Sequence, residues 1–152
     1  MFTNSLRAAQ NTFRMAQRNL ITPVKTATAP PPAASYSQAI KVNGFVYVSG
    51  QIPYTPENKP LSANPTIAEQ AEQVIQNVSN ILDASNSSLK HIVKATIFLT
   101  DMKTQFAEFN GVYGKHFSDF KPARSCIAVK ELPLGVDLEM EVVAVEKDDS
   151  KL

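Results

Sequence analysis

Two stretches of this chain are apolar on one helical face only, and this feature limits more than any other what the chain can fold into. The first begins with Thr66-Ile67-Ala68-Glu69, a capping box in which the Thr hydroxyl and the Glu carboxylate each satisfy a free backbone N–H. Its apolar residues recur every three or four positions, at Ile67, Ala71, Val74, Ile75, Val78, Ile81 and Leu82. The second lies between Asp101 and Pro122, with one face formed by Phe106, Phe109, Tyr113 and Phe117. Two such helices are expected to cover one face of a single sheet.

Runs of β-prone residues precede, separate and follow the two helices. Asn43-Gly44 is a strong hairpin signal, because both residues adopt the positive φ angles that a tight turn between strands requires. The predicted strands are Tyr36–Val42, Phe45–Ser49, Ile92–Leu99, Ala123–Val129 and Leu138–Lys147. The element order is therefore ββαβαββ, which predicts an α+β fold with a single mixed sheet and two helices on one face.

The last predicted strand is apolar on both of its sides. Val143 and Val145 point one way, and the other side is formed by Leu138, Met140, Val142 and Ala144. The two helices can cover only one face of the sheet, so the other face is expected to meet another subunit. The sequence therefore predicts a homo-oligomer.

Residues 1–21 differ in composition from the rest of the chain. No Asp or Glu occurs before Glu57, whereas three arginines lie opposite an apolar stripe when the segment is drawn as a helix; they are Arg7, Arg14 and Arg18. An amphipathic, acid-free, Arg-bearing N-terminus is typical of a mitochondrial transit peptide, and a surface helix docked through its Phe and Leu residues is the alternative. We therefore predict a transit peptide over 1–21, one domain over 22–147 with an extended, proline-rich lead-in at 22–34, and a C-terminal tail over 148–152.

Charge and cysteine content narrow the classes of function. Without the three leader arginines, 12 basic residues stand against 14 acidic ones, a net charge of −2, which disfavours binding to nucleic acid. No apolar run reaches the roughly 20 residues that span a bilayer. Cys126 is the single cysteine, so neither an intrachain disulfide nor a Cys-based metal cage can form. The sequence also lacks a Gly-rich phosphate loop and a Gly-x-Ser-x-Gly nucleophile motif. His91 and His116 are expected to have structural roles.

Several polar residues stand where a purely structural role is hard to assign. Arg124 and Cys126 share one face of a predicted strand, and arginine presents a planar fork suited to a carboxylate. Glu139 and Glu141 begin a strand face that then turns apolar. Asn110 is expected on the buried side of the second helix, where an amide requires a partner. On these residues alone, an ion pair of Arg124 with Glu139 or Glu141 is as good an interpretation as a functional site.

Five segments resemble the RidA (YjgF-type) family of reactive-intermediate deaminases. They are Tyr36–Ala39, Val48–Pro53, Phe109-Asn110, Pro122–Cys126 and Leu138–Val145. The pieces Ser-Gly-Gln-Ile-Pro and Pro-Ala-Arg-Ser-Cys, in this order and spacing, are specific signals, and the resemblance runs from Thr22 to Lys147. With its Arg-rich leader, the chain is similar to the fungal mitochondrial members of the family.

The resemblance implies a chorismate-mutase-like fold assembled as a homotrimer, with clefts between subunits. It implies hydrolysis of 2-imino acids, namely 2-aminoacrylate and 2-iminobutanoate, to 2-oxo acids and ammonia in the mitochondrial matrix, without a metal or a cofactor. This activity would support isoleucine metabolism and mitochondrial maintenance. Carried onto this chain, Arg124 would hold the substrate carboxylate and Glu139 would position the attacking water. The cleft would also be lined by Tyr36, Ser49, Gly50, Asn110 and Cys126.

Two other classes of function remain open. A non-catalytic regulatory protein that binds 2-oxo acids would need only Arg124 and its neighbours. A ribonuclease or translation inhibitor, an activity attributed to some family members, is disfavoured by the acidic body of the chain. Cys126 is expected to be a buried, inert thiol, since no base is found beside it in the sequence.

Overall fold

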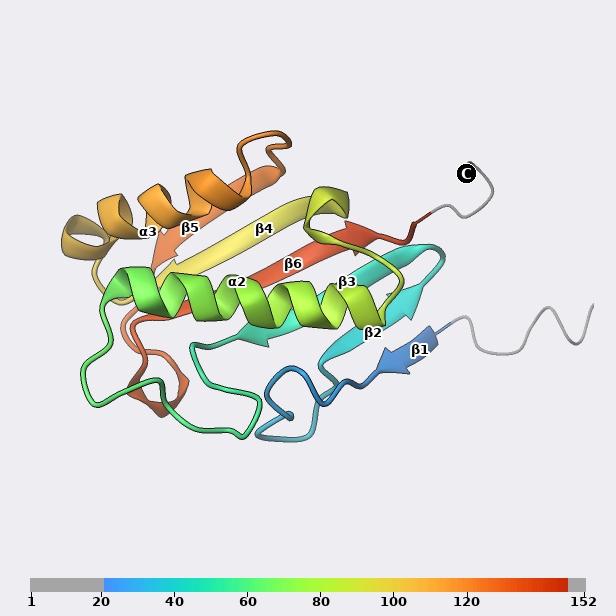
Figure 1. The fold of residues 1–152 in the computed structure, drawn as a ribbon, viewed down its shortest axis with the longest axis horizontal. Helices are drawn as coiled ribbons and strands as arrows, with labels where there is room; N and C mark the ends of the chain where they lie inside the picture. Colours follow the sequence, from blue (N-terminus) through green and yellow to red (C-terminus); the bar gives the residue numbers. More distant parts are fainter. Residues whose placement is uncertain (1–20, 148–152) are drawn as a thin grey trace, which may run out of the picture.

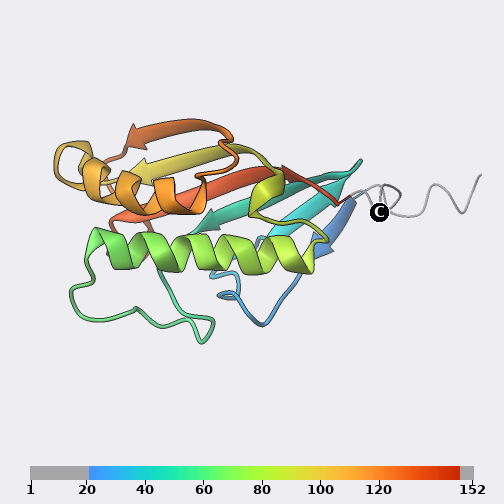
Figure 2. The same ribbon diagram turned by 45° about the horizontal axis from the view of Figure 1, so that its top comes forward.

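Two helices lie side by side on one face of a six-stranded sheet (Figures 1 and 2). The computed structural model describes residues 21–147. The strand order in the sheet is β1-β2-β3-β6-β4-β5, in which β4 and β5 are parallel and the other neighbours are antiparallel. The predicted α+β fold, with a mixed sheet and two helices on one face, is confirmed.

The strands correspond closely to the predicted β-prone runs. They are β1 (Ile21–Val24), β2 (Ala39–Val42), β3 (Phe45–Gln51), β4 (Ile92–Leu99), β5 (Ala123–Ala128) and β6 (Leu138–Val145). Asn43 and Gly44 connect β2 to β3 with φ angles of 51° and 78°, as the hairpin signal requires. The first strand was not predicted: the prolines at Pro23 and Pro30–Pro32 excluded a helix and indicated an extended lead-in, but not its pairing with β2. An edge strand tolerates a proline, since only one of its sides is in a ladder.

The predicted helix starts are also present. Helix α2 (Ile67–Ala84) begins with the capping box, in which Thr66 N donates to Glu69 Oε2 at 2.7 Å and Glu69 N donates to Thr66 Oγ1 at 3.2 Å. Helix α3 (Met102–His116) is capped by Asp101, whose Oδ1 accepts from Lys103 N at 2.9 Å. Among residues 21–147, no helix is long and apolar enough to cross a membrane.

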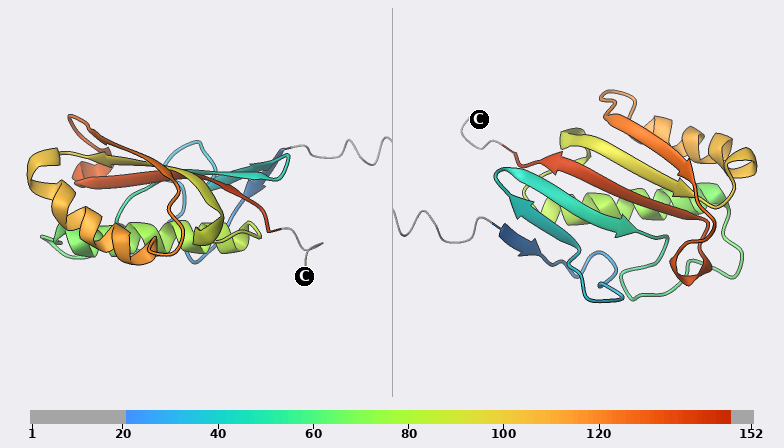
Figure 3. Two further views of the ribbon diagram at one scale, coloured as in Figure 1. Left: turned by 90° about the horizontal axis from the view of Figure 1, so that it is seen from above. Right: turned by 180° about the vertical axis from the view of Figure 1, so that it is seen from behind.

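The core lies between the helices and the sheet. The largest buried apolar side chains include Phe109, Ile75, Ile81, Leu82, Ile97, Leu99, Leu138 and Met140. The opposite face of the sheet carries no helix, as the view from behind in Figure 3 shows. Three large apolar side chains are exposed there: Phe45 at 41%, Tyr47 at 47% and Ile127 at 46%.

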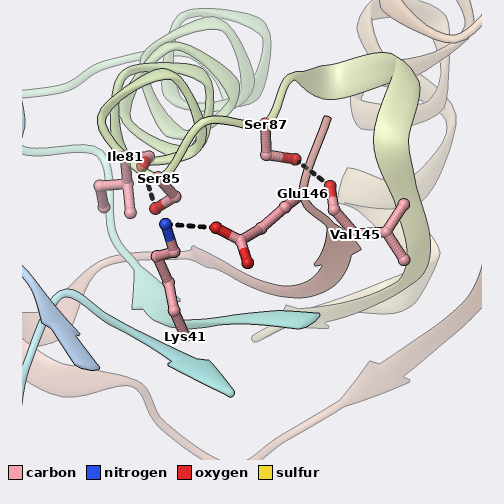
Figure 4. A network of polar contacts seen from close by, with 6 residues as sticks. All are labelled: Lys41, Ile81, Ser85, Ser87, Val145 and Glu146. Atoms are coloured by element: carbon pink, nitrogen blue, oxygen red, sulfur yellow. Dashed lines mark hydrogen bonds and ion pairs between the residues drawn. The ribbon is translucent and has the colours of Figure 1, made fainter. Parts of the chain in front are cut away.

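Polar contacts join the end of β6 to strand β2 and to the segment that follows α2 (Figure 4). The ammonium of Lys41 on β2 forms an ion pair with Glu146, just after β6. Ser87 Oγ donates to the carbonyl of Val145 at 2.7 Å. These contacts fix the end of β6 that lies farthest from Glu139, so the candidate site is at the other end of this strand.

Candidate functional site

A pocket beside the start of β6 brings together four of the predicted site residues. Its volume is about 330 Å³, and it is lined by Ala33, Tyr36, Ser49, Gly50, Ile52, Pro133, Leu134 and Glu139. The side chain of Glu139 lies on the uncovered side of the sheet, since its neighbours along β6, Leu138 and Met140, are buried beneath the helices.

The absence of a side chain on Gly50 leaves the space that the Glu139 carboxylate occupies. A Cβ built on Gly50 would lie 2.8 Å from Glu139 Cδ and closer still to Oε1, so any larger residue would displace the carboxylate. A break in the β3–β6 register causes this close approach. Val48 pairs with Val142 and Gln51 pairs with Met140, which leaves Ser49 and Gly50 opposite one residue, as in a β-bulge.

The Glu139 carboxylate is half-buried and unpartnered. Among residues 21–147, it has no hydrogen-bond donor and no ion-pair partner. Burial raises the pKa of Glu139 above its ordinary value of 4.5, and the like charge of Glu141 on the same strand face raises it further. A carboxylate of this kind is a stronger base than an exposed one, and it is free to accept a hydrogen bond from water.

The two hydroxyl groups in the pocket differ in the hydrogen bonds that they can still form with a ligand. Ser49 Oγ donates its proton to the carbonyl of Ser37 at 2.7 Å, so it faces a ligand as an acceptor. Tyr36 Oη accepts from Ala33 N at 3.1 Å, which leaves its own proton for a ligand. The pocket therefore has one donor hydroxyl and one base.

Arg124 lies with Asn110 in a separate group, between β5 and α3. Its Nη1 donates to Asn110 Oδ1 at 2.9 Å. Its guanidinium carbon lies 4.6 Å from the ring centroid of Tyr113 and 5.8 Å from that of Phe106. Among residues 21–147 no carboxylate is within ion-pair distance, so the remaining N–H donors can bind an anion.

The expected position of Asn110 was wrong, because this residue is exposed. The buried side of α3 is formed by Gln105, Phe109, Val112 and Tyr113, and Asn110 lies just beyond this stripe, toward β5. Its amide partner is Arg124 rather than a group in the core. This position allows Asn110 to orient the guanidinium at the protein surface.

Cys126 shares the strand face of Arg124. It is half-buried rather than buried, and its Sγ lies 3.9 Å from Met102 Sδ. Burial raises the pKa of the thiol, although the positive charge of Arg124 opposes this effect. A thiol whose pKa is raised is mostly protonated at neutral pH, and a protonated thiol is a poor nucleophile.

The alternative of an ion pair between Arg124 and Glu139 or Glu141 is wrong. Arg124 pairs with Ala95 across the β4–β5 ladder, and Ala95 is buried on the helix side. Glu139 and Glu141 pair with Phe98 and Thr96, which are half-buried on the other side. The arginine and the two carboxylates therefore lie on opposite faces of one sheet.

The histidines do not contribute to either group. His116 Nε2 lies 2.7 Å from Glu72 Oε2, between the two helices. His91 Nδ1 lies 2.7 Å from Ser88 Oγ, in the connection between α2 and β4. Within residues 21–147, no group of three or more His, Cys, Asp or Glu side chains could hold a metal ion.

Sequence reasoning did not identify the apolar wall of the Glu139 pocket. Ala33 comes from the lead-in, Ile52 follows β3, and Pro133 and Leu134 precede β6. No periodicity connects these loop residues. The only local signal was the Pro-Leu-Gly sequence, which indicates a turn but not what the turn lies against.

Comparisons with known proteins agree with this architecture. The family model described as Endoribonuclease L-PSP matches residues 26–146. Protein MMF1, mitochondrial, from Saccharomyces cerevisiae is 68% identical over 128 residues, which are 84% of this chain and 86% of that protein. The crystal structure of yeast Mmf1 has a TM-score of 0.80 and 68% identity, covering 84% of this chain and 99% of the other. The crystal structure of E. coli TdcF with bound serine has a TM-score of 0.77 and 35% identity, covering 83% and 99%.

Proposed function

Because this chain belongs to the endoribonuclease L-PSP family, which is the RidA family, we propose that it hydrolyses small 2-imino acids to 2-oxo acids and ammonia. The substrates would be 2-aminoacrylate, as its tautomer 2-iminopropanoate, and 2-iminobutanoate. One observation carries the proposal: the half-buried carboxylate of Glu139 has a raised pKa and is unpartnered among residues 21–147, and it faces a pocket of small-molecule size. Such a group is suited to aim a water molecule and to accept its proton.

The proposed reaction needs only a base and an anchor. Glu139 accepts a proton from water as the water oxygen bonds to the imine carbon, and the C=N π electrons move to nitrogen. Glu139 returns this proton to the nitrogen, which gives an intermediate with a hydroxyl and an amino group on the same carbon. Transfer of the hydroxyl proton to the amino group, again through Glu139, then allows the C–N bond to break. Ammonia then leaves and the carbon becomes the C=O of the 2-oxo acid. The imine carbon is already electrophilic, so neither a covalent intermediate nor a metal is required.

Arg124 would supply the anchor. A guanidinium offers a carboxylate two parallel N–H donors, and Asn110 together with the ring of Tyr113 keeps this fork in one orientation. The anchor and the base lie on opposite faces of the sheet, so one protomer cannot bring both to the same substrate. The proposed site is therefore formed by Arg124 of one protomer and Glu139 of another, with Tyr36, Ser49, Gly50, Asn110 and Cys126 around it.

This division supports a homo-oligomer, and we propose the homotrimer of the family. The uncovered sheet face exposes Phe45, Tyr47 and Ile127, which a neighbouring protomer would bury. A head-to-tail contact between two different surfaces closes into a ring when the rotation between protomers permits it. In such a ring, every interface would contain one arginine half and one carboxylate half.

We place the activity in the mitochondrial matrix. The basic, acid-free composition of residues 1–21 supports a transit peptide. A relative that is 68% identical is itself named mitochondrial. Removal of 2-iminobutanoate, which threonine dehydratase releases, would support isoleucine metabolism, and we infer that mitochondrial maintenance follows from this chemistry.

A non-catalytic role in binding 2-oxo acids is the second candidate. The observation that favours it is the relative TdcF, whose crystal structure contains bound serine, a small molecule with a carboxylate. A ribonuclease is the less favoured third candidate, because the chain after residue 20 has more acidic than basic residues.

A coupled assay tests the proposal. Threonine dehydratase generates 2-iminobutanoate, and the decay of the imine absorbance is followed with and without this protein. We expect the wild type to accelerate the decay and Arg124→Ala to lose most of this effect with its fold intact. Lys130→Ala, which removes an exposed cation outside both the Glu139 pocket and the Arg124–Asn110 pair, is the control and should retain it. If the imine decays at its uncatalysed rate while 2-oxobutanoate still binds, the protein is a binding module.

A further inference from the structure

Leu134 is in a backbone conformation that leucine rarely adopts. Its φ and ψ angles are 57° and 16°, in the left-handed region where a Cβ meets the following carbonyl oxygen. Its side chain is also 61% exposed, so no burial in this protomer compensates for the strain. Glycine or asparagine would fit this position better on local grounds. An unfavourable side chain that is both strained and exposed suggests a role outside folding.

Leu134 is one of the residues that line the pocket beside Glu139, and it also borders a neighbouring pocket next to Pro65 and Gln70. Leu134, Pro133, Ile52 and Ala33 form the apolar part of the lining, and the hydroxyl and carboxyl groups form the rest. The water-positioning carboxylate and the apolar wall thus border the same space. A substrate with its reacting carbon near Glu139 would direct its side chain to this wall.

The loop that carries the wall is anchored to the body of the protein. Asp137, three residues after Leu134, accepts from Thr100 Oγ1 at 2.9 Å, and its N–H donates to Gln70 Oε1 at 3.3 Å. Its carbonyl accepts from Thr100 N at 3.1 Å. The turn itself is closed by a hydrogen bond from Gly135 N to the Leu132 carbonyl at 3.2 Å. A loop that is fixed to α2 and to the residue following β4 holds Pro133 and Leu134 in place, so this part of the wall can discriminate side chains by size.

From this juxtaposition we propose that Leu134 is a specificity-determining residue, which packs on the aliphatic side chain of the 2-imino acid and favours substrates with longer or branched aliphatic side chains. This inference rests on the proposed function. The residues among 21–147 that line the pocket include no cationic side chain, and Glu139 would repel a second acid group. The class of substrate is therefore aliphatic 2-imino acids, with acidic ones disfavoured.

The test compares two imines in the wild type and in Leu134→Gly. The imine of leucine, made by an amino-acid oxidase, represents a branched side chain, and 2-aminoacrylate, made from serine by a dehydratase, represents a minimal one. We expect Leu134→Gly to lower the ratio of kcat/KM for the larger imine to that for the smaller by about tenfold, since a lost apolar contact in a pocket typically changes discrimination by this order. Glycine accepts the left-handed backbone, so the variant should fold.

Asn58→Gly is the matched control, because Asn58 is also exposed with a φ of 60° but does not line the pocket. Its ratio should equal that of the wild type. If Leu134→Gly keeps the wild-type ratio while hydrolysing both imines, the specificity role is wrong and the proposed function stands. If the wild type hydrolyses neither imine, both are wrong.

Discussion

Gly50 and Glu139 occupy one space between them: the carboxylate of Glu139 fills the position where a Cβ on residue 50 would lie. The two residues come from β3 and β6, and the register break between these strands brings them together. The placement of the proposed base therefore depends on a missing methyl group on the neighbouring strand.

Replacement of Gly50 by alanine tests this dependence. The added methyl should push the carboxylate out of line with the substrate, and a misplacement of about 1 Å typically lowers the rate about 100-fold. We expect kcat to fall by this order while KM changes little, because the arginine anchor is elsewhere. Gly111→Ala is the control: nothing lies within 4 Å of the added Cβ, and alanine in a helix should add about 0.5–1 kcal/mol of stability. Equal activity of the two variants would show that the position of Glu139 does not matter.

The pH dependence of turnover should follow the ionisation of Glu139. A general base is active when deprotonated, so kcat/KM should fall as the pH drops through the raised pKa of this residue, above 4.5. Glu141→Gln removes the neighbouring negative charge and should move this acidic limb to lower pH. Glu131→Gln, an exposed acid that does not contribute to the shift, should leave the profile unchanged. An acidic limb that stays in place in Glu141→Gln would exclude Glu139 as the titrating group.

Ionisation of Glu139 should also affect the stability of the fold. Deprotonation of Glu139 is expected to increase activity but to lower the free energy of unfolding. A raised pKa means that the folded state binds the proton of Glu139 more tightly than the unfolded state does, so this stabilisation is complete below the ordinary value of 4.5 and is lost as the pH rises through the raised pKa. We expect Glu139→Gln to increase the free energy of unfolding at pH 7 relative to the wild type, and to have less effect at pH 4. Denaturant titrations at the two pH values measure this difference. A larger gain at pH 4 would contradict the sign of the shift.

Mixing two inactive variants tests whether the site is divided between protomers. Arg124→Ala keeps the carboxylate half and Glu139→Gln keeps the arginine half. In a ring assembled at random from equal amounts, about one quarter of the interfaces would combine the two intact halves. We expect about this fraction of wild-type activity after joint unfolding and refolding, and only the small residual activity of each variant when it is refolded alone. No recovery in mixed rings, checked by mass, would show that the two halves do not work together.

Deletion of residues 1–20 tests the leader. Strand β1 begins at Ile21, which pairs with Val42, so this deletion preserves the sheet. We expect a fluorescent fusion of the shortened chain to lose its mitochondrial location while its unfolding temperature stays that of the full chain. Replacement of Arg7, Arg14 and Arg18 by glutamine should have the same effect on location. Retained import of the shortened chain would refute the transit peptide.

Local chemistry explains why most of the fold was predictable. The capping box at Thr66 and Glu69 and the turn at Asn43-Gly44 each specify one backbone geometry, and both are present. The apolar stripe of α2 indicates its buried face directly. Strand β1 was missed because its pairing with β2 is a tertiary contact that local propensity does not contain.

Less of the candidate site than of the fold could be predicted from the sequence. Alternation along a strand correctly placed Arg124 with Cys126, and Glu139 with Glu141. It could not say that the two pairs face opposite ways, because this depends on how β5 and β6 are ordered around β4 in the sheet. The position of Leu134 also follows from a backbone conformation that no residue pattern specified.

Because Arg124 and Glu139 lie on opposite faces of the sheet, the proposed activity would depend on how much of the protein the cell contains. A newly made protomer would have Arg124 on one face and Glu139 on the other, so it would have no complete site until it assembled with a second protomer. Assembly obeys mass action, so at low copy number the rate of imine removal would rise more steeply than the amount of protein. A given fall in the amount of protein would therefore cause a larger fall in the rate of imine removal.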